Sequence, residues 1–274
     1  MATLNTVFNR IYAEALEPYG YKKIKGRQPY FVRLIGDEII HIITVAPEPT
    51  VMPGERQFGI YGGAATVYRP RINLDITTRN NFDWLTNNLY IYRDSDIFED
   101  RPDRFSGKYR FSYEKDNEES LIKSVESSVF ATEQVLLEKL KNAIDLRRCM
   151  DFFWDFEDLV VHIIDNENLG ANCEWNEGLV NFKIFSNVEE YAEFRKKRYE
   201  INSEHMLYEI ENGGTGWTME DYKKKQISRE KNIQRDIELF EKYMSGQNHE
   251  KVMTELEKRK KLNLDILRSY GLEI

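Results

Sequence analysis

The first residues of the chain follow the period of an amphipathic helix. Apolar residues recur at three- and four-residue steps from Leu4 to Leu16, which places them on one face of an α-helix. Pro18 and Gly20 follow directly and end the helical pattern. We therefore expect a helix over residues 4–17.

After this helix the pattern changes to the two-residue period of β-strands. Within residues 21–45, two runs of β-branched and aromatic residues are separated only by Gly36 and Asp37, which signals a two-residue hairpin turn. Such a turn pairs Val32 with His41 and gives the hairpin an apolar face, which the first helix should cover, and a mixed face. The apolar face carries Tyr30, Val32, Leu34, Ile39, His41, Ile43 and Val45. The mixed face carries Phe31, Arg33, Ile35, Glu38, Ile40, Ile42 and Thr44.

Two further strands are expected before the pattern becomes helical, over residues 57–68 and 108–114. Small residues at 62–65 interrupt the first of them, which indicates a β-bulge or a close approach of another part of the backbone. Beyond Asn117 the apolar spacing changes from the period of a strand to that of a helix.

This change of period predicts an α+β fold in two regions. In residues 1–150, the N-terminal helix should pack on an antiparallel sheet. Residues 151–274 should form a mainly helical C-terminal half. These two ranges are also the predicted domains.

The last part of the chain should contain capped helices. Ser186 and Glu189 have the spacing of a capping box, Gly246 separates two apolar stripes, and Gly271 stands where a final helix should end. The stripes should pair as an antiparallel hairpin and cover either the sheet of their own chain, which we favour, or a second copy. The stripes are Ile233, Ile237, Phe240 and Met244, then Val252, Leu256, Leu264 and Leu267.

The amino-acid composition indicates a globular, acidic protein. The chain has 274 residues, 41% of them hydrophobic, and a formal net charge of −8, so we expect a globular protein of one or two domains. The acidic balance argues against nucleic-acid binding, which needs clustered positive charge. Cys149 and Cys173 are the only cysteines, and two thiols favour reduced, partly buried side chains over a disulfide framework. We find neither a secretory signal nor a membrane-spanning run, and we expect a cytoplasmic protein.

Several short motifs in the N-terminal half occur in a recognisable order. Residues 16–23 read Leu-Glu-Pro-Tyr-Gly-Tyr-Lys-Lys, residues 30–33 read Tyr-Phe-Val-Arg, and Gly36-Asp37 leads into an apolar strand. This order resembles domain-of-unknown-function family 4304, a bacterial family of uncharacterised proteins. The resemblance covers about the first half of the chain and implies a bacterial α+β domain. It brings no activity and no catalytic residues.

His41 is the first candidate for a catalytic or ligand-binding residue. It alternates onto the apolar face of the hairpin, where it is either a ligand or base held at the sheet or a core histidine bonded through one nitrogen. We favour the core histidine, because His41 has no partners at a fixed spacing.

Asp158 and His162 are the second candidate. They are four residues apart and would share one face of a helix, as in a general base that a carboxylate orients. No nucleophile stands at a fixed spacing from them, so a surface pair or a helix cap is the favoured interpretation.

Neither a metal nor a cofactor is expected. The acidic loop 94–103 has Glu99 where a calcium loop needs glycine and Phe105 where it needs glutamate. The glycine-rich segment 59–63 lacks the lysine and hydroxyl residue of a phosphate loop. The basic residues around Lys22 and Lys23 fit a protected strand edge better than a nucleic-acid surface.

Two hypotheses for function follow. The leading one is a protein-binding module that neutralises a basic protein partner through an acidic middle segment, with Asp151, Asp155 and Asp158 as contact residues. The alternative is an enzyme that acts on a small anionic substrate, with His41 or His162 as acid and base. Its anion clamps would be Arg33, Arg69 and Arg71. The sequence does not decide whether the protein is an enzyme or whether it forms oligomers.

Overall fold

The computed structural model describes residues 2–26, 29–48, 52–69, 72, 110–152, 177–212 and 217–274. The chain divides into two compact units, and each is described by itself. The first comprises residues 1–157 together with 259–274, and the second comprises residues 158–258. The sequence pattern assigned residues 259–274 to the helical second region, whereas the structure groups these residues with the sheet.

The first helix forms as predicted. α1 spans Leu4–Leu16, and the side chain of Thr3 caps it by accepting a hydrogen bond from the Thr6 amide. A 3₁₀ turn, η1 (Glu17–Tyr19), follows and ends at Gly20, whose φ of 78° is the left-handed conformation typical of a helix end.

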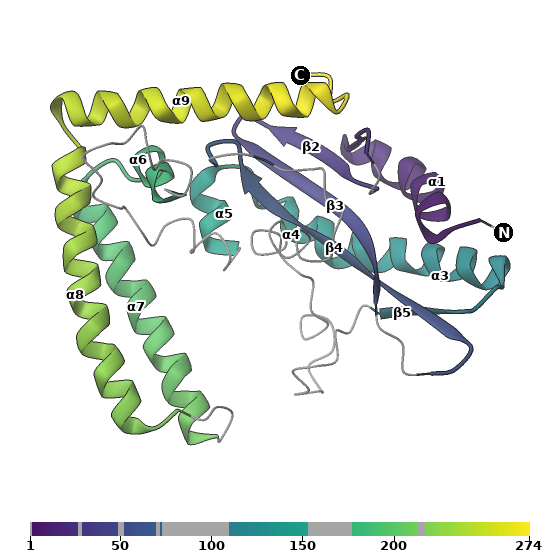
Figure 1. Ribbon diagram of the computed structural model, residues 1–274, viewed down its shortest axis with the longest axis horizontal. Coiled ribbons are helices and arrows are strands. Elements are labelled where there is room, and N and C mark those ends of the chain that lie inside the picture. Colours follow the sequence, from purple (N-terminus) through teal and green to yellow (C-terminus); the bar gives the residue numbers. More distant parts are fainter. Residues whose placement is uncertain are drawn as a thin grey trace. The chain divides into compact units, whose positions relative to one another are not determined.

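The sheet confirms the predicted fold class. Within the described residues, five strands form one antiparallel sheet in the order of the chain (Figure 1). The strands are β1 (Lys22–Lys23), β2 (Phe31–Ile35), β3 (Ile39–Glu48), β4 (Glu55–Thr66) and β5 (Arg110–Glu114). A mostly helical C-terminal half follows, so the chain is an α+β protein.

The register of the first hairpin differs from the prediction by one residue. Ile35 pairs with Ile39, so the connection has the three residues Gly36, Asp37 and Glu38. Glu38 does not extend the β2–β3 ladder; its carbonyl oxygen instead accepts hydrogen bonds from the Val67 amide and the Thr66 hydroxyl, beside the end of β4. Contacts with a third strand therefore override the local turn signal.

A one-residue shift moves side chains to the other face of the sheet. Phe31 and Arg33 now share a face with His41 and Ile43, whereas Val32 shares the opposite face with Ile42. The first of these two faces meets α1, because the Phe31 and Phe8 rings lie 5.8 Å apart. The expected composition of the two faces was therefore wrong for β2.

A second helical segment lies beside α1 on this face. α3 (Glu118–Ala131) continues into a π-helix, η3 (Thr132–Leu137), and then into α4 (Glu138–Leu140) and α5 (Leu146–Phe152). Leu136 of η3 packs so closely on β4 that a Cβ atom at Gly62 would lie 2.5 Å from its Cδ2 atom. The small residues of β4 therefore permit a close approach, and the strand runs through them without a break.

The second unit is built around an antiparallel helical hairpin (Figure 1). η6 (Glu177–Val180) and α6 (Asn181–Ile184) precede α7 (Val188–Glu211) and α8 (Met219–Tyr243). Arg195 bonds to Asp236, and Tyr199 bonds to the Gln226 carbonyl, so α8 pairs with α7. The hairpin expected between α8 and the last helix was therefore wrong.

The cap of α7 differs from the prediction by one residue. Asn187 caps α7 one residue later than the expected Ser186, because its side chain accepts from the Glu190 amide. At α8, Thr218 and Asp221 form a complete capping box. The side chains of Ser186 and Asn187 can both reach amides of the first turn of α7, and the local sequence does not decide which of them caps the helix.

The last helix, α9, spans Gly246–Ser269 and ends before Gly271, which has a φ of 93°. The boundary between the two units lies within it, at Arg259. In the first unit, Asn263 bonds to the backbone of Val67, Arg69 and Ile72, just after β4. The C-terminal part of α9 thus packs on the sheet unit of its own chain, which was the favoured alternative.

Candidate functional site

His41 is a core histidine. Its ring is 1% exposed, and its Nε2 atom lies 2.8 Å from the Ala143 carbonyl oxygen, to which it donates when the ring is neutral. Burial lowers the pKa of His41 to about 4; the hydrogen bond to Ala143 opposes this shift, and the nearby Arg33 charge adds to it. The ring is therefore neutral near pH 7 and enclosed, which does not suit an acid or base that meets a substrate.

The three arginines proposed as anion clamps do not form a site among the described residues. Arg33 lies on β2 opposite His41 and is partly buried. Arg69 is 4% exposed, and its carbonyl oxygen accepts from Asn263. Neither lines the pocket described below, and Arg71 lies outside the described residues.

The side chains of the acidic contact residues lie outside the described part of the chain. Asp151 belongs to α5, but its side chain is not described, and Asp155, Asp158 and His162 lie outside the described residues. Cys149, which precedes them, is buried, and burial raises the pKa of its thiol to about 12. This cysteine is therefore an inert core side chain, as expected.

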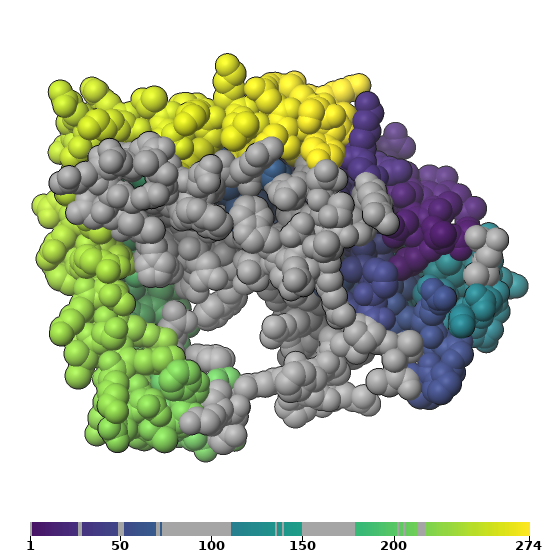
Figure 2. Space-filling model, in the orientation of Figure 1, coloured from purple at the N-terminus to yellow at the C-terminus, as the bar shows by residue number. Residues whose placement is uncertain are grey.

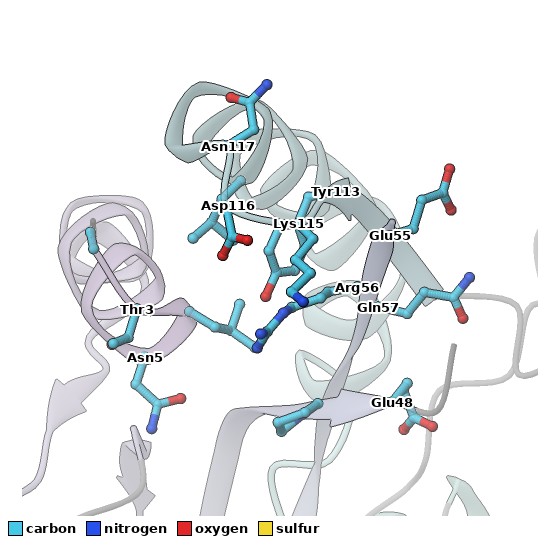
Figure 3. A pocket seen from close by; sticks show the side chains of 14 residues that line it. Thr3, Asn5, Glu48, Glu55, Arg56, Gln57, Tyr113, Lys115, Asp116 and Asn117 are labelled. Carbon is cyan, nitrogen blue, oxygen red and sulfur yellow. The ribbon is translucent and has the colours of Figure 1, made fainter. Parts of the chain in front are cut away.

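A pocket of about 780 Å³ lies where the sheet extends beyond the first turns of α1 and α3 (Figure 3). Residues 2–5, at the start of α1, line one side, and Asn117 and Leu121, at the start of α3, line another. The end of the β3–β4 hairpin, Tyr113 of β5 and the turn after β5 complete the lining. In the space-filling view, surfaces of α1 (purple), β4 (blue) and α3 (teal) adjoin on this side of the first unit (Figure 2).

Side chains alternate between the two faces of the sheet, and this alternation places the basic residues of the pocket on one face. Arg56 pairs with Tyr113 across β4 and β5, and Lys115 lies two residues beyond Tyr113, so all three share the face that carries the helices. Glu55 alternates onto the other face. Figure 3 shows the side chains of Arg56 and Lys115 pointing toward one another in the pocket, while Glu55 points away. The pocket therefore receives the basic side chains of the strand ends.

Among the described residues, neither Arg56 nor Lys115 forms an ion pair. Asp116 follows Lys115 in the turn, with a φ of 62°, and its side chain is exposed. Two neighbouring cations without a carboxylate between them repel each other, and an anion placed between them would relieve that repulsion.

The N-terminus of α1 adds to the positive potential. Thr3 caps the Thr6 amide, and the first turn of α1 contains no acidic residue, so the positive end of its helix dipole is not offset within the helix. α3 differs, because Glu118 and Glu119 lie in its first turn and Glu118 accepts a hydrogen bond from the Ala2 amide at 2.9 Å. Of the two helix ends at the pocket, α1 is the one without an acidic residue in its own first turn, although the Glu118 carboxylate also lies beside its start.

Tyr113 supplies a neutral hydroxyl to the same face. Burial raises the pKa of Tyr113, and the Arg56 guanidinium opposes that rise through its charge and a hydrogen bond. Because the pKa is above its ordinary value, the hydroxyl keeps its proton at neutral pH. It adds hydrogen-bonding capacity without negative charge.

Sequence reasoning missed Arg56 and Lys115. The predicted strand began at residue 57, which left Arg56 in a loop, and Lys115 follows the last residue of its strand. Their meeting depends on pairing between β4 and β5, which are far apart in the chain. A basic residue at the end of each of two expected strands was the only local signal, and it is common on protein surfaces.

The described residues offer neither a metal site nor a membrane-spanning helix. No group of three or more histidine, cysteine or acidic side chains able to hold a metal ion occurs in the described part of the chain. Its helices also include none that is both long enough and apolar enough to cross a bilayer. Comparison of the chain with protein-family models, with curated proteins and with solved structures gave no match. The resemblance to family 4304 therefore stays a prediction.

Proposed function

We propose that this protein is a binding protein that holds an anionic group of its ligand between Arg56 and Lys115. The observation that supports the proposal is the convergence of these two cations in one pocket, where neither forms an ion pair with another described residue. Arg suits the planar recognition of oxyanions, and Lys adds a mobile point charge. Asn5, Thr3 and Tyr113 offer neutral hydrogen-bonding groups around them.

This proposal keeps one element of each sequence-based hypothesis. It retains binding as the activity, and it retains an anionic ligand, but it replaces Arg33, Arg69 and Arg71 with a different pair of cations. Capture of a basic protein by Asp151, Asp155 and Asp158 stays a separate prediction, because the described residues do not include those side chains.

The test compares two double variants of equal charge. Arg56→Gln with Lys115→Gln removes both cations of the pocket, and Arg10→Gln with Lys22→Gln removes two exposed cations that do not line it. The probes are inorganic phosphate, sulfate and benzoate, and the readout is binding heat by titration calorimetry. We expect at least one anion to bind the wild type and the control variant, and the pocket variant to lose that binding by tenfold or more.

Either of two calorimetric results would contradict the proposal. If no probe binds the wild type, or if the two double variants bind equally well, the pocket is not an anion site and the proposal is wrong. Both variants change exposed side chains, so their circular dichroism spectra should match the wild type.

A further inference from the structure

We infer that the anionic group is a phosphate monoester carried by a small organic molecule. This inference rests on the proposed function and adds the chemical class of the ligand. The geometry points to it through three separate features of the pocket: its charge, the helix end that lines it, and its size.

The charge of the pocket suits a dianion. Arg56 and Lys115 provide two positive charges on the face that carries the helices. A phosphate monoester carries a charge of about −1.5 to −2 near pH 7, whereas a carboxylate or a sulfate monoester carries −1. Asp116 lies next to the two cations and lowers the positive potential that they set up, and a dianion gains about twice the remaining attraction of a monoanion.

The helix end offers donors for a tetrahedral group. The amides of Leu4 and Asn5 are the first of α1, and helix geometry leaves such amides without partners inside the helix. Phosphate groups bind at helix N-termini because these amides and the helix dipole act together. Here the helix end lies in the same pocket as two cations, which supply most of the attraction.

The pocket is large enough to hold a small organic molecule and not only a phosphate ion. A volume of about 780 Å³ lies within the range of about 300–1,000 Å³ that is usual for small-molecule sites. Leu4, Pro47 and Leu121 give it apolar wall beside the charged residues. An organic body esterified to the phosphate would occupy that part of the pocket.

The test uses three probes that share a phenyl group. Phenyl phosphate is a dianion, phenyl sulfate is a tetrahedral monoanion, and benzoate is a planar monoanion. By calorimetry at pH 7.5, we expect phenyl phosphate to bind at least tenfold more tightly than either monoanion and more tightly than inorganic phosphate. Arg56→Gln and Lys115→Gln should each weaken phenyl phosphate by about tenfold, while Arg10→Gln should have no effect.

Asp116 provides a variant that should improve binding. Asp116→Asn removes one negative charge from the pocket, and asparagine tolerates the left-handed φ of 62° at this position. We expect this variant to bind phenyl phosphate several-fold more tightly. Lowering the pH from 7.5 to 5 protonates the phosphate, whose second pKa is about 6, and should weaken phenyl phosphate but not phenyl sulfate.

The outcomes separate the inference from the proposed function. If benzoate or phenyl sulfate binds as tightly as phenyl phosphate and still depends on Arg56 and Lys115, the pocket is an anion site and the phosphate class is wrong. If inorganic phosphate binds as tightly as phenyl phosphate, the organic body is wrong. If none of the probes depends on these residues, both proposals fail.

Discussion

The side-chain amide of Asn263, near the end of α9, donates a hydrogen bond to the carbonyl oxygen of Val67 at 2.7 Å. The same nitrogen donates to the Arg69 carbonyl oxygen at 2.8 Å, and the side-chain oxygen accepts from the Ile72 amide. Asn263 is fully buried, so it replaces water as the partner of three backbone groups where the chain leaves β4. One side chain thus joins the C-terminal helix to the sheet of the same unit.

Asn263→Ala should therefore be strongly destabilising. It removes a hydrogen bond from each of three backbone groups in a buried place, at a cost of about 1–3 kcal/mol each before relaxation, so we expect the free energy of unfolding to fall by about 3 kcal/mol or more. Urea denaturation measures this change. Asn142→Ala, at an exposed position with one side-chain bond to the Glu138 carbonyl, is the control and should cost less than about 0.5 kcal/mol. Equal losses would contradict the role given to Asn263.

Tyr12 links α1 to α3 through its hydroxyl group. That oxygen lies 2.9 Å from the hydroxyl oxygens of both Ser128 and Thr132, and all three groups are buried. Tyr12→Phe should lower the free energy of unfolding by about 1–2 kcal/mol, because it removes these bonds and leaves the shape unchanged. Tyr30→Phe is a matched control, since the Tyr30 hydroxyl is also buried but has no hydrogen-bond partner among the described residues. The Tyr30 variant should be neutral or slightly more stable, and thermal denaturation of both variants tests the contrast.

Local patterns predicted the elements of this fold well and their pairing poorly. The helix over residues 4–17, the left-handed glycines at 20 and 271 and the break at 246 all follow from neighbouring residues, and the structure contains them. The register after Gly36 was wrong because Glu38 bonds to the end of β4. That contact joins residues far apart in the chain, and no local pattern reports it.

The candidate site was beyond sequence reasoning for the same physical reason. His41 could be assigned to the core, because a lone histidine among alternating apolar residues has no chemical partners. Arg56 and Lys115 meet only because β4 pairs with β5 and the pleat turns both side chains to one face. A cation at a strand end has no distinguishing pattern until its neighbour across the sheet is known.

A buried ion pair joins α7 to α8 in the second unit. The Arg195 guanidinium donates to a carboxylate oxygen of Asp236 at 2.8 Å, and the Asp236 side chain is fully buried. Asp236→Leu alone should cost about 3–5 kcal/mol, because it leaves the Arg195 charge buried without its partner. Adding Arg195→Met should recover most of that loss, since well-packed apolar pairs often replace buried ion pairs without cost.

A double-mutant cycle by urea denaturation measures the coupling between these two residues. Arg235→Gln is the control, because Arg235 contacts the same carboxylate at 3.4 Å from a side chain that is 56% exposed, and it should cost less than about 1 kcal/mol. If the single Asp236 variant is as stable as the wild type, the pair does not hold the hairpin together.

His41 should make the stability of the first unit depend on pH. Its pKa is about 4 in the folded protein and about 6.5 when unperturbed, because burial disfavours the charged ring. Between these two values the unfolded chain binds a proton at His41 that the folded chain does not, so stability falls as the pH is lowered. The contribution of His41 should be a loss of up to about 1.4 kcal/mol per pH unit from pH 6.5 down to pH 4, with no effect above pH 6.5 and no further loss below pH 4.

Carboxylate groups titrate over part of the same window, so the measurement is a difference between variants. His41→Gln keeps a side-chain donor toward the Ala143 carbonyl oxygen but cannot titrate, and it should remove the His41 contribution from the slope of unfolding free energy against pH. His249→Gln, in the second unit, should leave that contribution in place. Denaturant titrations at half-unit steps from pH 7.5 to pH 4 compare the three slopes for the unfolding transition of the first unit. Equal slopes for the wild type and His41→Gln would show that the buried ring accepts its proton without cost, which contradicts the enclosed environment described for His41.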